Sequence, residues 1–188
     1  CIRDSDSGGV IVVKDKRNLD KIAAVKKLKS CLKADNYAST REWPYKNVPR
    51  RVIAETYMED EKTGELRDYK FFSFDGVVRA MFVSQDRGKV GEDVKFDYFD
   101  ADYNHLPISQ YHEHGRTTPA KPSCFEEMKD LASKLSKGIP QVRVDFYEVD
   151  GKVYFGELTF FHHGGIVPFY PEEWNYTFGS WIKLPLQK

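Results

Sequence analysis

Apolar residues recur at helical spacing in several segments, which predicts that helices make up part of the fold. One amphipathic helix is predicted over residues 20–33. A second is predicted over residues 123–137, where Ser123-x-x-Glu126 has the form of a capping box and Gly138 follows as a stop signal. A short third helix is predicted over residues 171–182, because it opens with a proline.

Strands are predicted where β-branched and aromatic residues alternate with polar ones. The predicted strands cover residues 10–14, 51–58, 68–74 and 77–84. A turn at Asp75-Gly76 joins the last two of them. The polar stretch 88–118 is predicted to be irregular, and a loop of that length usually has a function. Helices and strands in this order place the chain in the α+β class.

The clearest pattern is a β-hairpin around Asp150-Gly151, a strong turn signal between two alternating apolar runs. A two-residue loop would send two carboxylates, Asp145 and Glu157, to opposite faces of the hairpin. A three-residue loop that begins at Val149 would put both carboxylates and Arg143 on one face. A slip of one residue exchanges the faces, so we prefer the three-residue loop, which keeps the other face apolar. That apolar face is predicted to hold Val142, Val144, Phe146, Tyr154, Leu158 and Phe160.

Two carboxylates on adjacent strands suit a hard divalent cation such as Mg²⁺, which takes one or two protein carboxylates and leaves its other positions to phosphate and water. The alternative is a solvated sheet face with an ion pair between Arg143 and Asp145. Spacing alone favours this alternative, because periodicity carries no information about ligands.

The composition is that of a soluble globular protein. The chain has 188 residues, of which 40% are hydrophobic and 31% charged. Lys plus Arg and Asp plus Glu number 29 each, so charge gives no argument for a nucleic acid partner. The three cysteines are widely spaced, which indicates a reducing, cytoplasmic setting. No apolar run reaches the length of a membrane span.

A series of segments, taken in order, resembles the TupA-like ATP-grasp family. That family is named for teichuronopeptide biosynthesis, and its members occur among bacterial surface-polysaccharide functions. The resemblance runs from about residue 7 to about residue 184. The similar segments are residues 7–16, 41–46, 52–58, 68–72, 142–147, 154–160 and 171–174.

The resemblance implies an ATP-grasp-like fold, in which antiparallel sheets with flanking helices form a nucleotide cleft. We expect residues 1–6 to be an unmatched head and residues 7–50 to be a partial small lobe. Residues 51–188 would then form the C-terminal lobe, with the metal-binding hairpin at 141–160. The lysine-bearing strand that precedes the glycine loop in complete members is not recognisable here, which indicates an N-terminally truncated member.

The resemblance also implies a set of cofactor-binding residues for ATP. The residues are Ser7, Gly8, Gly9, Lys14, Glu55, Thr56, Tyr57, Met58 and Lys70. The small residues at 7–9 would wrap the phosphates, and Lys14 would reach toward one of them. The carboxylate of Glu55 would bond a ribose hydroxyl, while the backbone of residues 56–58 reads adenine. From the residues alone, residues 7–9 are typical of a turn, Lys14 of a solvated strand-end lysine and Glu55 of an exposed strand residue.

Four residues carry the expected chemistry in the family. Lys70 and Arg143 would be catalytic, because a basic group can neutralise charge that develops on a transferred phosphate. Asp145 and Glu157 would hold Mg²⁺. Surface pairing of Lys70 with a neighbouring aspartate remains the alternative. Where ATP-grasp proteins often have Glu-x-Asn, this chain has Thr159, and a hydroxyl is a weaker ligand than an amide oxygen.

The function implied is that of an ATP-dependent carboxylate–amine ligase in cell-surface polysaccharide or teichuronopeptide biosynthesis. The acceptor would be a small molecule or a polysaccharide-linked group. Alternatives are a hydroxyl kinase, a non-catalytic nucleotide-binding module, and a glycosyltransferase that uses Asp100-Ala-Asp102. His112-Glu-His114 and His162-His163 lack companion ligands at useful spacing, so a zinc site is not expected.

Overall fold

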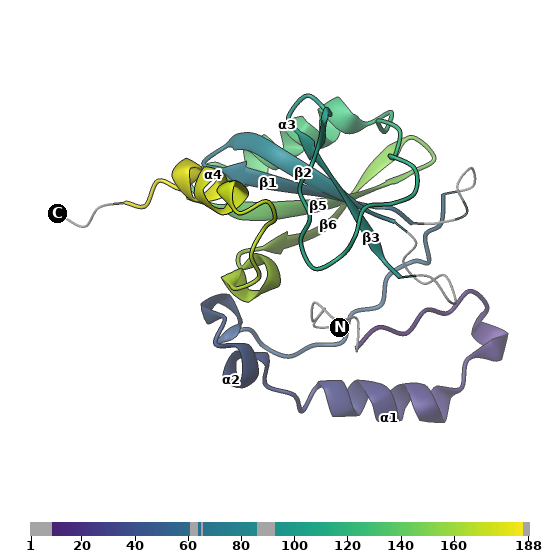
Figure 1. Ribbon diagram of the computed structural model, residues 1–188. Helices are drawn as coiled ribbons and strands as arrows, with labels where there is room; N and C mark the ends of the chain where they lie inside the picture. Colours follow the sequence, from purple (N-terminus) through teal and green to yellow (C-terminus); the bar gives the residue numbers. More distant parts are fainter. Residues whose placement is uncertain (1–8, 61–63, 65, 86–92, 186–188) are drawn as a thin grey trace. The chain divides into compact units, whose positions relative to one another are not determined.

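The computed structural model describes residues 9–60, 64, 66–85 and 93–185 (Figure 1). The chain divides into two compact units, Cys1–Met58 and Glu59–Lys188. The predicted division into a head of residues 1–6 and lobes of 7–50 and 51–188 stays a prediction.

The described residues of the first unit form two helices, α1 at Lys21–Cys31 and α2 at Asn36–Thr40, and two 3₁₀ turns at Lys16–Asn18 and Trp43–Tyr45. Helix α1 confirms the prediction for residues 20–33. It begins because the carboxylate of Asp20 accepts a hydrogen bond from the backbone of Ala23 at 3.0 Å, as an N-cap does.

The strands predicted at 10–14 and 51–58 are wrong. Within residues 9–58 the structure has no strand. Residues such as Val10 and Val12 have the β propensity that the prediction used, but a strand also needs a hydrogen-bonded neighbour. The carbonyl of Val10 instead accepts from the side chain of Lys27 at 2.9 Å.

The second unit is built on one six-stranded antiparallel sheet in the order β4-β3-β2-β1-β5-β6. Its strands are β1 Asp68–Phe74, β2 Val77–Gln85, β3 Lys95–Asp100, β4 His105–Leu106, β5 Val142–Val149 and β6 Lys152–Thr159. The prediction of β1, β2 and their turn is confirmed, since Asp75 and Gly76 both have positive φ angles, 45° and 82°. The prediction of an irregular stretch at 88–118 is wrong where β3 and β4 lie. In β3 aromatic and charged residues alternate over six positions, and they form a strand although the stretch as a whole is polar.

Two helices cover the two faces of the sheet (Figure 1). Helix α3, Phe125–Ser136, packs on the face that carries Phe71, Met81 and Val144. Helix α4, Glu173–Trp181, packs through Phe178 on the opposite face. The predicted helices at 123–137 and 171–182 are thereby confirmed.

The predicted capping box at the start of α3 is wrong. The hydroxyl of Ser123 donates to the carboxylate of Glu148 on β5, and the carboxylate of Glu126 pairs with Lys121 at 2.8 Å. A tertiary partner for Ser123 and a nearby lysine for Glu126 therefore replace the capping box. The predicted end of the helix is correct, because Gly138 follows it with a φ of +80°.

The hairpin of β5 and β6 differs from the predicted register. Val149 pairs with Lys152, so the loop is the two-residue Asp150-Gly151 and the three-residue loop is wrong. A bulge at Gly156 then adds one residue to β6, and Asp145 pairs directly with Glu157. The predicted placement of both carboxylates on one face is therefore correct.

The bulge also decides which residues of β6 face the core. Val153 and Leu158 pack against the core under α3, as the switch of faces at the bulge requires. Tyr154 was predicted on that face but pairs with Tyr147 and is 39% exposed, so its placement is wrong. The bulge forms at a glycine because a Cβ at 156 would lie 3.0 Å from the carbonyl oxygen of Asp145.

Candidate functional site

The central strands bring four charged residues together in the second unit. Lys70 on β1 lies directly opposite Asp145 on β5, and Asp145 lies directly opposite Glu157 on β6. Arg143 is two residues before Asp145 and therefore projects from the same face of β5. All four predicted catalytic and metal-binding side chains thus share one place on the sheet.

The guanidinium of Arg143 is the centre of this cluster. Its Nε donates to Asp145 Oδ1 and its Nη2 to Asp145 Oδ2, both at 2.7 Å, which is a bidentate pair. The same Nη2 donates to Glu157 Oε1 at 3.0 Å and to Thr159 Oγ1 at 2.9 Å. One nitrogen is therefore surrounded by oxygens from three residues.

The cluster is deeply buried. Asp145 is 1% exposed, Lys70 5% and Arg143 8%. Lys70 donates to Asp145 and also lies 3.4 Å from the carboxylate of Asp68. Three carboxylates consequently share two cations, because Glu157 also contacts Arg143. A buried charge persists only when it is paired in this way.

The pairing sets the ionisation of Asp145 and Arg143. Burial alone would raise the pKa of Asp145, but the positive charges of Arg143 and Lys70 outweigh it and lower the pKa to about 2. Burial opposes the charge of Arg143 as well, and the Asp145 carboxylate outweighs it and raises the pKa of the guanidinium. The pair therefore stays ionised at neutral pH.

A neutral histidine extends the cluster toward the β3–β4 side. Arg143 Nη1 donates to His162 Nδ1, and His162 Nε2 donates to Gln110 Oε1, each at 2.7 Å. Burial, and then the positive charge of Arg143, hold the pKa of His162 well below its usual value. The hydroxyl of Tyr98 donates to the same Gln110 oxygen at 3.3 Å. Sequence reasoning missed Gln110, since no pattern links it to a hairpin more than thirty residues away.

The oxygen atoms around Arg143 Nη2 are of the type that Mg²⁺ takes as ligands. They are two carboxylate oxygens and one hydroxyl, all oxygen ligands. The guanidinium nitrogen holds the point where they converge, so a bound cation and this position of Arg143 exclude each other. The hydroxyl of Thr159, which the sequence indicates to be a weaker ligand, is one of the three oxygens at this point. These residues fit a magnesium ion.

Apart from Lys70, the predicted nucleotide-binding residues belong to the first unit. Ser7 and Gly8 fall outside the described residues, and Gly9 is buried in a turn. The structure brings two others together, because Lys14 Nζ lies 5.2 Å from the ring centre of Tyr57. The remaining three, Glu55, Thr56 and Met58, lie in the irregular segment before residue 59, where Met58 is partly buried and the other two are exposed.

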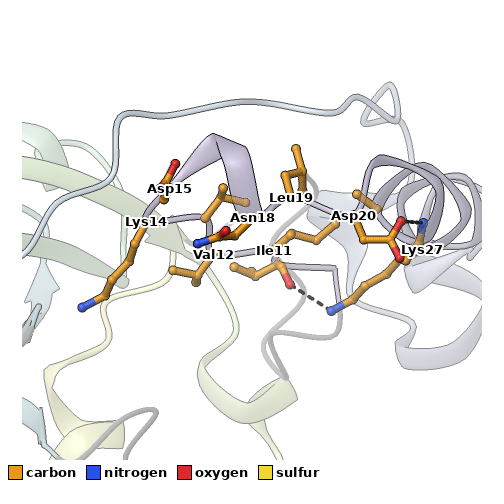
Figure 2. Close-up of a pocket in the computed structure, with 12 residues that line it drawn as sticks. Ile11, Val12, Lys14, Asp15, Asn18, Leu19, Asp20 and Lys27 are labelled. Carbon is orange, nitrogen blue, oxygen red and sulfur yellow. Dashed lines mark hydrogen bonds between the residues drawn. The ribbon is translucent and has the colours of Figure 1, made fainter.

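The first unit also has an open pocket of about 450 Å³ between residues 10–15 and the start of α1 (Figure 2). Lys14 belongs to its lining but extends away from Asp20 and Lys27 in this view. The pocket is mainly apolar, and its polar rim includes Asp15 and Asn18.

Asp100 is the last residue of β3, and a turn follows it at Ala101 and Asp102. The carboxylate of Asp100 accepts hydrogen bonds from the backbone of Asp102 at 2.9 Å and from the backbone and side chain of Asn104 at 2.8 Å each. The Asp102 side chain is 82% exposed. Both carboxylate oxygens of Asp100 thus serve the turn.

An antiparallel sheet with helices on both faces, and a hairpin that holds converging carboxylates, is the architecture expected of an ATP-grasp protein. A family model described as TupA-like ATPgrasp matches residues 2–183, so the chain belongs to this family. Proteins of the ATP-grasp fold generally bind ATP with Mg²⁺. No curated protein and no solved structure matches the chain. Among the described residues, no helix is long and apolar enough to cross a membrane.

Proposed function

We propose that the protein binds Mg²⁺–ATP and acts as an ATP-dependent carboxylate–amine ligase in the biosynthesis of bacterial cell-surface polysaccharide or teichuronopeptide. Membership of the family supports the nucleotide and the class of enzyme. The observation that carries the site is the convergence of Asp145, Glu157 and Thr159 oxygens on one cationic nitrogen. The biosynthetic pathway, the ligase chemistry and a cytoplasmic location are proposed from the family resemblance alone.

In this proposal Asp145 and Glu157 hold the metal, with Thr159 beside them. The magnesium ion would neutralise charge on the phosphates of ATP. Lys70 and Arg143 are the cations nearest to it, and they would bind the terminal phosphate and stabilise the negative charge that develops during its transfer. Arg143 suits this role because its planar guanidinium can exchange one bidentate oxyanion partner, a carboxylate, for another, a phosphate.

His162 would position Arg143. It is neutral, and its Nδ1 accepts from Arg143 Nη1 while Gln110 fixes the other ring nitrogen. A neutral acceptor holds the guanidinium without adding a charge that would compete with phosphate.

The reaction proposed has two steps. An acceptor carboxylate oxygen attacks the terminal phosphorus of ATP, which releases ADP and leaves an acyl phosphate. An amine nitrogen then attacks the acyl carbon, inorganic phosphate leaves, and an amide remains after loss of a proton. The nucleotide contacts of Ser7, Gly8, Gly9 and Lys14 and of residues 55–58 belong to the same proposal.

Binding of Mg²⁺–ATP, measured by titration calorimetry, tests the proposal. The wild-type protein should bind ATP only in the presence of Mg²⁺, and the double variant Asp145→Asn, Glu157→Gln should lose this binding. The matched control is Glu127→Gln, Asp130→Asn, which removes the same charge from the exposed side of α3 and should bind normally. Circular dichroism of all three proteins shows whether the double variant is folded.

A wild-type protein that binds no ATP with Mg²⁺ present would refute the proposal. Release of ADP that requires both a carboxylate and an amine acceptor would support ligation. Turnover with a hydroxyl acceptor alone would identify a kinase. Binding without turnover across an acceptor screen would indicate a nucleotide-binding module.

Glycosyl transfer is the less favoured alternative. It would require Asp100 and Asp102 to bind a metal and a sugar nucleotide, but the carboxylate of Asp100 is occupied by its own turn. Loss of activity in an Asp100→Ala, Asp102→Ala variant, with Asp145 dispensable, would reverse this preference.

A further inference from the structure

A second cluster of possible ligands lies on the other face of the sheet. Asp97 on β3 pairs directly with Val83 on β2, and Val83 belongs to the core under α3. Lys70 pairs directly with Phe82, which belongs to the opposite core under α4. Asp97 therefore points away from the charge cluster around Arg143, and a site built on it is separate from the proposed ATP site.

Two histidines meet Asp97 on this face. His105 Nε2 lies 3.1 Å from Asp97 Oδ1, and His114 Nδ1 lies 3.4 Å from the same oxygen. The three ligand atoms are all within 4.8 Å of one another. A tetrahedral zinc ion with bonds of about 2.0–2.2 Å requires ligand atoms roughly 3.3–3.6 Å apart. The two separations from Asp97 Oδ1 are close to that range, and the two nitrogens, at most 4.8 Å apart, are near enough for rotation of the imidazole rings to bring them into it.

The other carboxylate oxygen of Asp97 is fixed by its own partners. Gln85 Nε2 donates to Oδ2 at 2.7 Å, and the backbone N–H of Gly115 donates to it at 3.1 Å. A Cβ at position 115 would lie 2.7 Å from the Gln85 nitrogen and 2.9 Å from Oδ2, so this approach needs glycine. Asp97 is only 1% exposed. The carboxylate is thus held with Oδ1 toward the two imidazoles, as outer partners orient metal ligands.

Hydrogen bonding leaves one atom of the cluster unexplained. His114 Nδ1 is buried and makes no hydrogen bond within the described part of the chain, although Asp97 Oδ1 is 3.4 Å away. An unsatisfied buried nitrogen is unfavourable because it has given up its hydrogen bonds to water. The Asp97 oxygen already lies within hydrogen-bonding distance of His105. A cation bound among the three atoms would give His114 Nδ1 the partner that it lacks.

We propose that Asp97, His105 and His114 form a binding site for Zn²⁺. Two imidazole nitrogens and one carboxylate oxygen are a donor set that favours zinc over magnesium. The side chains of His105 and His114 are 37% and 35% exposed, so the cluster lies near the surface. The ion would tie β3, the short edge strand β4 and the segment after β4 to one another.

The test is the zinc content of the purified protein after incubation with Zn²⁺ and dialysis into metal-free buffer. The wild-type chain should retain one zinc per molecule, and Co²⁺ in its place should give the visible absorption of a low-coordinate site. The double variant Asp97→Asn, His114→Ala should lose both signals. The matched control is His112→Ala, because its ring packs on Phe96 at 4.4 Å rather than in the cluster, and it should retain zinc.

A wild-type protein without stoichiometric zinc would overturn the proposal, whatever the variants do. Equal zinc in the wild type and in the Asp97→Asn, His114→Ala variant would also overturn it. The Asp145→Asn, Glu157→Gln variant should keep its zinc, since that cluster lies on the other face of the sheet. If this variant lost its zinc, the ion would be bound at the Asp145 cluster and the proposal would be wrong. Zinc at 100 times its Kd should raise the Tm of the wild type by roughly 5 °C or more and leave that of the Asp97 variant unchanged.

Discussion

Replacement of Asp145 by asparagine removes one charge and keeps the shape of the side chain. Asp145 is 1% exposed and is the shared partner of Arg143 and Lys70. In the variant, the buried cations Arg143 and Lys70 have one carboxylate fewer to balance their positive charge. Breaking a buried ion pair from one side costs about 3–5 kcal/mol. Because Glu157 still contacts Arg143 and Asp68 still contacts Lys70, we expect the lower end, about 3 kcal/mol at pH 7.

The pKa of Asp145 gives this difference a pH dependence of known sign. Its pKa falls from 3.8 in the unfolded chain to about 2 in the folded protein, so the folded state favours the carboxylate. The resulting stability, about 2 kcal/mol, is complete well above pH 4 and is lost as the pH falls from about 4 to 2. Asparagine does not titrate. The wild type should therefore lose about 1 kcal/mol of its advantage by pH 3.

Urea unfolding followed by circular dichroism at pH 7, 5, 4 and 3 measures both effects. The control is Asp102→Asn, whose side chain is 82% exposed and should change the free energy of unfolding by less than about 0.5 kcal/mol. A difference between wild type and Asp145→Asn below about 1 kcal/mol at pH 7 would contradict the buried ion pair. A difference that stays constant down to pH 3 would contradict the lowered pKa.

Two packing predictions accompany this one. Gly156→Ala should lower the free energy of unfolding in urea by about 1–3 kcal/mol, because the new Cβ would lie 3.0 Å from the Asp145 carbonyl oxygen and 3.3 Å from Tyr147; an unchanged midpoint would mean that the bulge adapts freely. Phe178→Ala should cost about 3–5 kcal/mol in the same assay, because it removes the ring that packs edge-on against Phe72 at 5.1 Å; a loss below 1 kcal/mol would show that α4 contributes little to the core.

The hairpin shows what alternation can and cannot predict from sequence. The argument from two coherent faces placed Arg143, Asp145 and Glu157 together correctly, but through a three-residue loop that does not exist. The real loop has two residues, and the bulge at Gly156 supplies the missing shift. One extra residue in the turn or one in the strand gives the same faces beyond the bulge, at Glu157 and Leu158, and opposite faces before it, at Val153 and Tyr154. A single sequence therefore predicts the faces more securely than the pairing.

Other features depend on contacts that no local pattern contains. The strands predicted at 10–14 and 51–58 have the right composition, but composition does not provide a pairing partner. In β3, Asp97 occupies a core-side position, which broke the apolar alternation and concealed the strand. The sequence spacing around His114 did not predict a metal site, because its companion ligands are Asp97 and His105. These two residues become neighbours only once β3 and β4 have paired.

The proposed site requires metal and phosphate to bind together. In the structure Arg143 compensates the carboxylates of Asp145 and Glu157 through one nitrogen. If Arg143 turned toward a phosphate alone, it would leave Glu157 without its cation and Asp145 with only Lys70. A cation that entered alone would displace the guanidinium into a buried site with fewer anions around it. Binding of phosphate alone and binding of the cation alone are each unfavourable, because each leaves a poorly compensated buried charge. When both bind, the phosphate balances Arg143 and the cation balances the carboxylates. The cluster thus gives a physical reason why ATP binding should depend on Mg²⁺.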